Sequence, residues 1–101
     1  MGNPFWSDLA KAELDEVIYF IGVTRRRPET AIRLYFEIRD AVNDFFQRGK
    51  RGHAHPALPA GWLYVKIKRW LVAYETIDGE EIIHRIVDAS RDLEKVFEED
   101  R

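Results

Sequence analysis

Three histidines are the first side chains of this sequence to suggest chemistry. His53 and His55 lie two residues apart in a segment rich in Gly and Pro, and with His84 they could ligate a metal ion. His84 also lies between Glu81 and Arg85, and such a group could supply the acid and the base of a nuclease. The structural alternatives are two polar loop residues and a strand histidine hydrogen-bonded across its sheet. We expect no metal and no cofactor, because loop histidines beside Pro and Ala are most often ordinary polar residues.

Two basic clusters are the other candidates for a functional role. The densest is a triplet that could contact a phosphate or an acidic protein segment: Arg25, Arg26 and Arg27. The second lies between aromatic residues, a mixture that can bind nucleic acid: Lys66, Lys68 and Arg69. The structural alternatives are a solvated turn between helices and a hairpin tip whose neighbouring aromatic side chains face the core.

Helical periodicity places the arginine triplet between two amphipathic helices. Apolar residues at helical spacing predict a first helix over residues 7–21, with Ser7 as its N-cap and Gly22 as its stop. A second helix is predicted from Pro28, which suits the first helical position, to the vicinity of Gly49. Its expected apolar stripe is Ala31, Ile32, Tyr35, Ile38, Val42, Phe45 and Phe46. The two helices would form an αα-hairpin.

The second half of the chain has the composition of strands. A loop over residues 49–61 precedes three runs rich in β-branched and aromatic residues, at 62–65, 70–76 and 81–88. Asp78-Gly79 is a strong hairpin signal, and residues 66–69 would form the earlier turn. In a regular strand the adjacent His84 and Arg85 would point to opposite faces.

The order of elements predicts an α+β fold. We expect the helical hairpin to cover one face of a small antiparallel sheet of three to four strands, with residues 3–6 as a candidate edge strand. Ser90 would cap a short C-terminal helix that carries Leu93, Val96 and Phe97. The length of 101 residues fits one domain over residues 1–101.

Composition narrows the class of protein further. The chain has no cysteine, which excludes disulfides and a thiol nucleophile. Its longest apolar run, residues 17–23, is far shorter than the roughly 20 residues of a membrane span, so we expect a cytoplasmic protein without a membrane partner.

The net charge of −2 hides an asymmetry along the chain. Residues 25–74 hold eleven basic and four acidic residues, giving +7, whereas the two ends together are at −9.

Five segments match patterns of one toxin superfamily, and one of them is the loop over residues 56–62, matched to P.....L..G.R. Residues 10–19 fit A..DL..I..YI with Glu13 in the place of Asp, and residues 31–45 fit A..L...I..A...L. Residues 70–76 fit YRVFYRV loosely, and residues 83–93 fit I.RVLHGARDL, the most specific match. The chain therefore resembles the RelE/ParE superfamily of bacterial toxins, in particular its ParE-like branch, over nearly its whole length.

This resemblance implies a type II toxin that is wrapped and neutralised by a cognate antitoxin in a hetero-oligomer. It also implies an N-terminal strand, and an incomplete one would leave a sheet edge open to strand addition by the antitoxin. ParE-like toxins poison DNA gyrase by protein–protein contact, whereas RelE-like toxins cut mRNA in the ribosome. A non-toxic binding module on the same fold is a third possibility.

The residues of RelE-like nucleases are at best half present. Arg91 matches the arginine after the last strand, whereas Phe97 occupies the position of a nuclease tyrosine. A ribosome-dependent mRNA endonuclease would have to use His84, Arg85, Arg91, Lys66 and Lys68. Because surfaces that bind ribosomal RNA are usually strongly basic, the net negative charge favours DNA gyrase over the ribosome and mRNA as target.

Partner contacts would fall on cationic and apolar side chains. We expect the antitoxin to cover apolar surface of the second helix, the sheet edge and the last helix. The residues expected to bind the antitoxin or the target are Arg25, Arg26, Arg27, Arg85, Arg91, Leu93 and Phe97.

Overall fold

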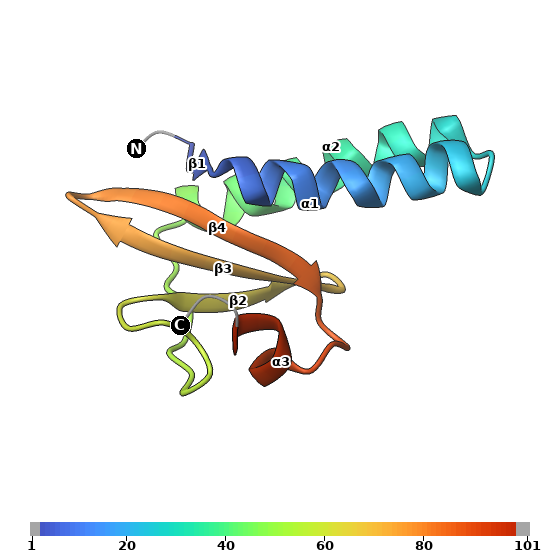
Figure 1. Ribbon diagram of the computed structural model, residues 1–101. Coiled ribbons are helices and arrows are strands. Elements are labelled where there is room, and N and C mark those ends of the chain that lie inside the picture. Colours follow the sequence, from blue (N-terminus) through green and yellow to red (C-terminus); the bar gives the residue numbers. More distant parts are fainter. Residues whose placement is uncertain (1–2, 99–101) are drawn as a thin grey trace.

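A four-stranded sheet in the order β1-β4-β3-β2 forms the centre of the computed structural model, which describes residues 3–98 (Figure 1). The strands β2 (Leu63–Ile67), β3 (Trp70–Ile77) and β4 (Glu80–Asp88) form an antiparallel meander. The predicted edge strand is present as β1 (Phe5–Trp6), but it pairs with β4 in parallel, so the expectation of a purely antiparallel sheet is wrong. The helical hairpin, a loop and strands β2 and β3 separate β1 from β4, so no tight turn imposes an antiparallel direction.

The predicted helical hairpin is confirmed as α1 (Asp8–Tyr19) and α2 (Pro28–Gln47). Ser7 caps α1, because its Oγ accepts a hydrogen bond from the backbone N–H of Ala10 at 3.1 Å. The predicted stop at Gly22 is wrong, because a π-helical turn, η1 (Phe20–Thr24), continues the helix to the arginine triplet. Such π turns are rare in proteins as a whole, and those that occur are often found at functional sites.

Both faces of the sheet are covered, by different elements. Figure 1 shows the hairpin on one side of the sheet and the short helix α3 (Leu93–Glu98) on the other. Side chains of β3 alternate between the two cores: Trp70, Val72 and Tyr74 pack with the hairpin, whereas Leu71 and Ala73 pack with α3. The first five residues of this strand are consequently buried, and its sequence is a nearly continuous apolar run.

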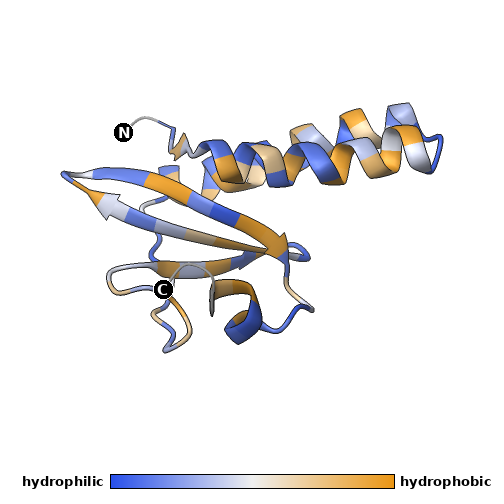
Figure 2. Cartoon of the chain, in the orientation of Figure 1, coloured by the Kyte–Doolittle hydropathy of each residue, from blue (hydrophilic) through white to orange (hydrophobic). Residues whose placement is uncertain are grey.

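The end of the hairpin near η1 projects beyond the sheet (Figure 1), and this changes which residues are buried. Ile32, expected in the apolar stripe of α2, is 59% exposed, whereas the buried residues of α2 are Ala31, Ile38, Val42 and Phe46. Apolar and polar segments alternate along both helices (Figure 2). No helix within residues 3–98 is long and apolar enough to cross a lipid bilayer.

Two smaller predictions need correction at the turns. Lys66 belongs to β2 and not to the turn, because Ile67 pairs with Trp70 and leaves a two-residue connection. The cap of α3 is Asp92 and not Ser90, since the Asp92 carboxylate accepts from the backbone N–H of Glu94 at 3.0 Å. Asp is as good an N-cap as Ser, so composition alone did not separate the two positions.

The predicted Asp78-Gly79 turn is confirmed, and it supports a stability prediction. Both residues have positive φ, 51° and 82°, as a type I′ turn requires. A Cβ at Gly79 would meet no atom within 4 Å, so Gly79→Ala acts through the backbone alone. We expect it to lower the free energy of unfolding by about 1 kcal/mol in urea titrations. Asp78→Asn is the control and should change that value by less than about 0.5 kcal/mol. Equal effects of the two would contradict this account.

Candidate functional site

A concave groove lies between the hairpin and the end of the sheet. Its volume is about 590 Å³. The apolar side chains that line it come from α1, η1, α2, β3 and β4: Val17, Phe20, Ile21, Leu34, Trp70, Ile86 and Val87. Phe20 remains 48% exposed, although it is a large aromatic residue. The groove therefore presents apolar surface to solvent at a concave position, as binding sites do.

Charged side chains surround this apolar groove, and some of them are already paired. Arg69 and Asp88 form an ion pair at 2.6 Å, and Glu13 pairs with Arg85. The other charged residues in the lining are Glu16, Arg25 and Arg91. A smaller cavity of about 270 Å³ shares Phe20, Ile21 and Arg25 with the groove and adds Arg27.

Of the predicted binding residues, the structure thus brings Arg25 and Arg91 together at one groove, 66 positions apart in the sequence. Arg27 borders the adjoining cavity, whereas Arg26 lines neither. Arg26 adopts a φ of 56° at the turn after η1, where its exposed side chain faces solvent. Two arginines of the triplet, Arg25 and Arg27, therefore lie at the groove or the adjoining cavity, and Arg26 lies in the turn.

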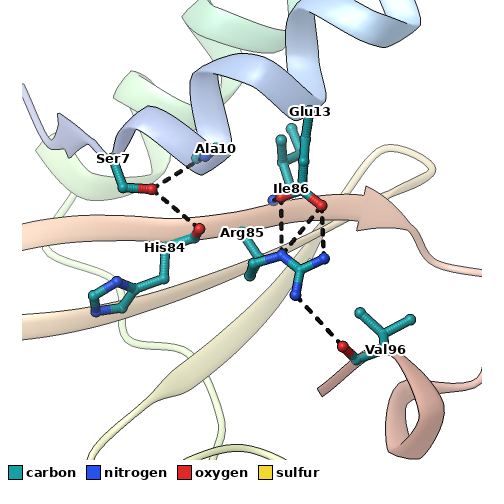
Figure 3. A network of polar contacts seen from close by, with 7 residues as sticks. All are labelled: Ser7, Ala10, Glu13, His84, Arg85, Ile86 and Val96. Carbon is teal, nitrogen blue, oxygen red and sulfur yellow. Dashed lines mark hydrogen bonds and ion pairs between the residues drawn. The ribbon is translucent and has the colours of Figure 1, made fainter. Parts of the chain in front are cut away.

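Glu13 and Arg85 form a nearly buried ion pair that joins α1 to β4 (Figure 3). The Arg85 Nε and Nη2 donate to the Glu13 carboxylate at 3.1 and 2.9 Å, and the backbone N–H of Ile86 donates to it at 3.0 Å. Arg85 Nη1 reaches the carbonyl of Val96 in α3 at 3.4 Å. The exposed fractions of the two side chains are 15% for Glu13 and 12% for Arg85. Arg85, predicted as a catalytic or partner-binding residue, is thus engaged in holding three elements together.

His84 lies on the same face of the sheet as Arg85, contrary to the expectation for a regular strand. Ala73 pairs with Arg85 and Tyr74 with Ile83, so His84 is the extra residue of a β-bulge. The His84 ring stacks on Trp62 with 4.1 Å between ring centroids, and its Nε2 is 3.0 Å from Glu75 Oε1. The bulge therefore creates a His–Glu pair on the α3 side of the sheet.

The remaining nuclease candidates do not join this pair. Lys66 and His84 are on β2 and β4, with β3 between them, so their strands are roughly 10 Å apart. Lys68 lies in the β2–β3 turn with a φ of 57°, and Arg91 follows β4 at the groove. The five candidate residues thus come from β2, the β2–β3 turn, β4 and the segment after β4, and the structure does not bring all five together.

The apolar side chains of the last helix, α3, pack into the core of the protein. Phe97 has no exposed surface, and Leu93 is half-buried against the same cluster. A contact between Phe97 and an antitoxin would require α3 to leave the sheet. The predicted binding role of these two residues remains a prediction.

The histidines of the loop are placed by an aromatic neighbour. The rings of His53 and His55 lie 5.9 and 6.0 Å from that of Tyr64, and His53 forms an isolated β-bridge with Tyr64. His84 is on β4, which β3 separates from β2 and therefore from Tyr64. Across residues 3–98 no three side chains of the types that bind metals come together.

Two important residues were missed at the sequence level: Glu13 and Phe20. Glu13 lies outside the apolar spacing of the first helix, so periodicity gives no sign that it is largely buried against Arg85; its one sequence signal is its place in the A..DL..I..YI pattern. Phe20 enters the groove through the π turn, and helical periodicity contains no sign of such a turn. Trp70, one of the aromatic residues beside the basic hairpin tip, packs under the hairpin, which confirms the alternative that these side chains face the core.

Asp88 at the groove supports a prediction about pH. The backbone N–H of Ser90 donates to its carboxylate at 2.9 Å and Arg69 pairs with it, which together hold the pKa of Asp88 well below its usual value. Because the folded pKa is the lower one, this carboxylate stabilises the fold above about pH 4, and the contribution is lost as the pH falls further. NMR titration should show Asp88 still ionised at about pH 3. In Arg69→Gln the midpoint should rise, and an unchanged midpoint would contradict the role of Arg69.

Comparison with known proteins agrees with this architecture. The family model described as "ParE toxin of type II toxin-antitoxin system, parDE" matches residues 5–95. A solved structure described as "Chromosomal ParDE TA system from P. aeruginosa" is similar in fold, with a TM-score of 0.69 and 21% sequence identity, over 89% of this chain and 98% of that one. No curated protein matches the chain. The match over most of the chain shows the class, a small α+β toxin of the type II kind. The chain belongs to the ParE toxin family.

Proposed function

We propose that this ParE-like toxin is neutralised by a cognate antitoxin and inhibits DNA gyrase through protein–protein contact. The observation that carries the proposal is the state of Arg85. This strand arginine, the best placed of the catalytic candidates, is bound to Glu13 and is only 12% exposed. A guanidinium held in this way is unavailable to stabilise a scissile phosphate.

The surface of the chain supports contact with protein rather than catalysis. The groove combines apolar side chains with a few arginines, a composition common in protein interfaces. Other large apolar residues of the hairpin, outside the groove lining, are also exposed: Tyr19, Val23, Ile32 and Phe36. Exposed apolar side chains inside and outside the groove suit a toxin that meets both an antitoxin and a target.

Gyrase as target follows from family membership. ParE-like members of the superfamily act on DNA gyrase, and the chain belongs to the ParE toxin family. A protein target also agrees with the net charge of −2, since a nucleic-acid target would favour a basic surface.

The test is a DNA supercoiling assay with purified gyrase and the isolated toxin. We expect supercoiling to be inhibited, and stoichiometric antitoxin to restore it. His84→Ala should inhibit as well as the wild type, because contact with gyrase does not depend on an acid–base group. Unaffected supercoiling at toxin concentrations that arrest growth would overturn the gyrase proposal.

A second candidate function, cleavage of mRNA in the ribosome, is favoured by one observation. The bulge turns His84 to the α3 side of the sheet, where Glu75 Oε1 lies 3.0 Å from its Nε2 and can orient the imidazole as an acid–base group. Primer extension on mRNA from cells expressing the toxin tests this function. Cuts at codon positions that vanish in His84→Ala would establish the nuclease, and intact mRNA would exclude it.

A further inference from the structure

We propose that a basic edge of the sheet binds the phosphate backbone of double-stranded DNA. The basic edge consists of four cationic residues from the loop before β2, from β2 itself and from the turn after it: Lys50, Arg51, Lys66 and Lys68. Three observations carry the inference: a long segment without acids, the row of cations along β2, and a surface that exposes no large apolar residue. The inference goes beyond the proposed function, which requires contact with protein only.

The positive charge of this edge is not compensated by nearby acids. Residues 45–74 contain six Lys or Arg and no Asp or Glu. The acids that border this segment are already engaged, since Asp44 pairs with Arg48 at 2.9 Å and Glu75 lies 3.0 Å from the Nε2 of His84. The four residues of the basic edge are exposed and form no ion pair within residues 3–98. A chain with a net charge of −2 therefore still presents one surface suited to a polyanion.

The four cations follow one outer strand. β2 is the last strand in the sheet order, so one of its sides has no neighbouring strand (Figure 1). The backbone of His53 pairs with that of Tyr64, which holds the loop and its two cationic residues near the beginning of β2. The two lysines lie toward the end of β2 and in the turn, and from Tyr64 to Lys68 the chain extends about 13 Å. A DNA strand carries one phosphate about every 3.4 Å along the helix axis, so this row matches about four phosphates.

The other edge of the sheet differs in kind. Beyond β1, backbone groups of β4 are occupied by contacts within the chain. The hydroxyl of Ser7 donates to the carbonyl of His84, and the N–H of Ile86 donates to Glu13 (Figure 3). The edge of β4 is thus closed by the chain itself, whereas the edge of β2 carries exposed lysine side chains.

The basic edge also lacks the apolar centre of a protein interface. Eight large apolar residues are exposed among residues 3–98, and none of them belongs to residues 45–74. Protein interfaces bury apolar and aromatic side chains at their centre, whereas contacts with the DNA backbone join Lys and Arg to phosphate oxygens. The basic edge therefore fits a nucleic acid better than a protein. Its regular row favours the evenly spaced phosphates of a duplex.

The experiment compares two quadruple variants of the full-length toxin in binding to a fluorescein-labelled DNA duplex, measured by fluorescence anisotropy. The edge variant is Lys50→Gln, Arg51→Gln, Lys66→Gln and Lys68→Gln. The control variant neutralises four exposed residues elsewhere: Lys11→Gln, Arg26→Gln, Arg33→Gln and Lys95→Gln. Both variants change the net charge equally, and each includes one residue with positive φ, 57° at Lys68 and 56° at Arg26. Circular dichroism spectra should confirm that both variants keep the fold.

The wild type should bind the duplex with a Kd on the order of 10 µM at about 50 mM salt, and log K should fall with log salt with a slope of about −3. The edge variant should bind at least about 30-fold more weakly and lose most of this slope, whereas the control should stay within about 3-fold of the wild type. Equal affinities of the two variants would overturn the edge as the site.

Two competitors test the kind of ligand. The wild type should bind the DNA duplex more tightly than a polyglutamate peptide or an RNA duplex of the same sequence. Tighter binding to either competitor would overturn DNA as the ligand. The supercoiling assay is a separate measurement, because a failure to inhibit gyrase would overturn the proposed target and leave the DNA site standing.

Discussion

Replacing Glu13 by alanine is expected to lower the free energy of unfolding by about 3 kcal/mol. The substitution leaves the Arg85 guanidinium 12% exposed without its carboxylate, and it removes the acceptor of the Ile86 N–H. A buried charge without its partner destabilises the folded state by much more free energy than the intact ion pair contributes. The expected loss of stability is therefore large. Urea unfolding followed by circular dichroism measures it.

Glu16→Ala is the control for this change. Glu16 lies on the same helix but is exposed, so its loss should alter the free energy of unfolding by less than about 0.5 kcal/mol. The double variant with Arg85→Met should lose less than the sum of the single changes, because the two side chains interact directly. Additive losses would mean that the pair contributes nothing through its own contact.

Phe97→Ala should have an effect of similar size, about 3 kcal/mol, through a different cause. Phe97 has no exposed surface, packs edge-to-face with Trp62 at 6.2 Å and lies under the Arg85 guanidinium. Six residues do not form a stable helix alone, so α3 depends on this anchor. We expect α3 to detach, which shifts the fluorescence of Trp62 toward that of solvated indole.

Lys95→Ala tests whether the effect belongs to the buried ring. Lys95 is exposed on the same short helix, and its removal should leave both the fluorescence and the free energy of unfolding unchanged within about 0.5 kcal/mol. A Phe97→Asp variant would lose antitoxin binding through the loss of α3, so it says little about direct contact. A Phe97→Ala variant as stable as Lys95→Ala would refute the anchoring role.

The helices and the turn could be predicted because their signals are local. Ser7, Pro28 and the Asp78-Gly79 pair each act through the backbone of their own neighbourhood, and each has the role that its chemistry indicates. Burial was predicted less well. Ile32 has the right spacing for a core face, but the sheet ends before reaching that part of α2, and no local pattern records the length of a sheet.

The candidate site could be predicted only in part, because it depends on contacts between distant residues. Arg25 was singled out for its charge and Arg91 for its place in the pattern after the last strand, but their meeting at one groove depends on how the hairpin crosses the end of the sheet. The β-bulge at His84 is a property of the pairing between β3 and β4. Alternation along one strand therefore predicted opposite faces for His84 and Arg85, and that was wrong.

The closed edge of β4 has a consequence for the toxin on its own. An open strand edge is a template for pairing with another chain, and a toxin separated from its antitoxin would then tend to aggregate. Ser7, Glu13 and Arg91 occupy backbone groups along this edge with contacts inside the same chain. On this side of the sheet these backbone groups are therefore not available for edge-to-edge pairing with another chain.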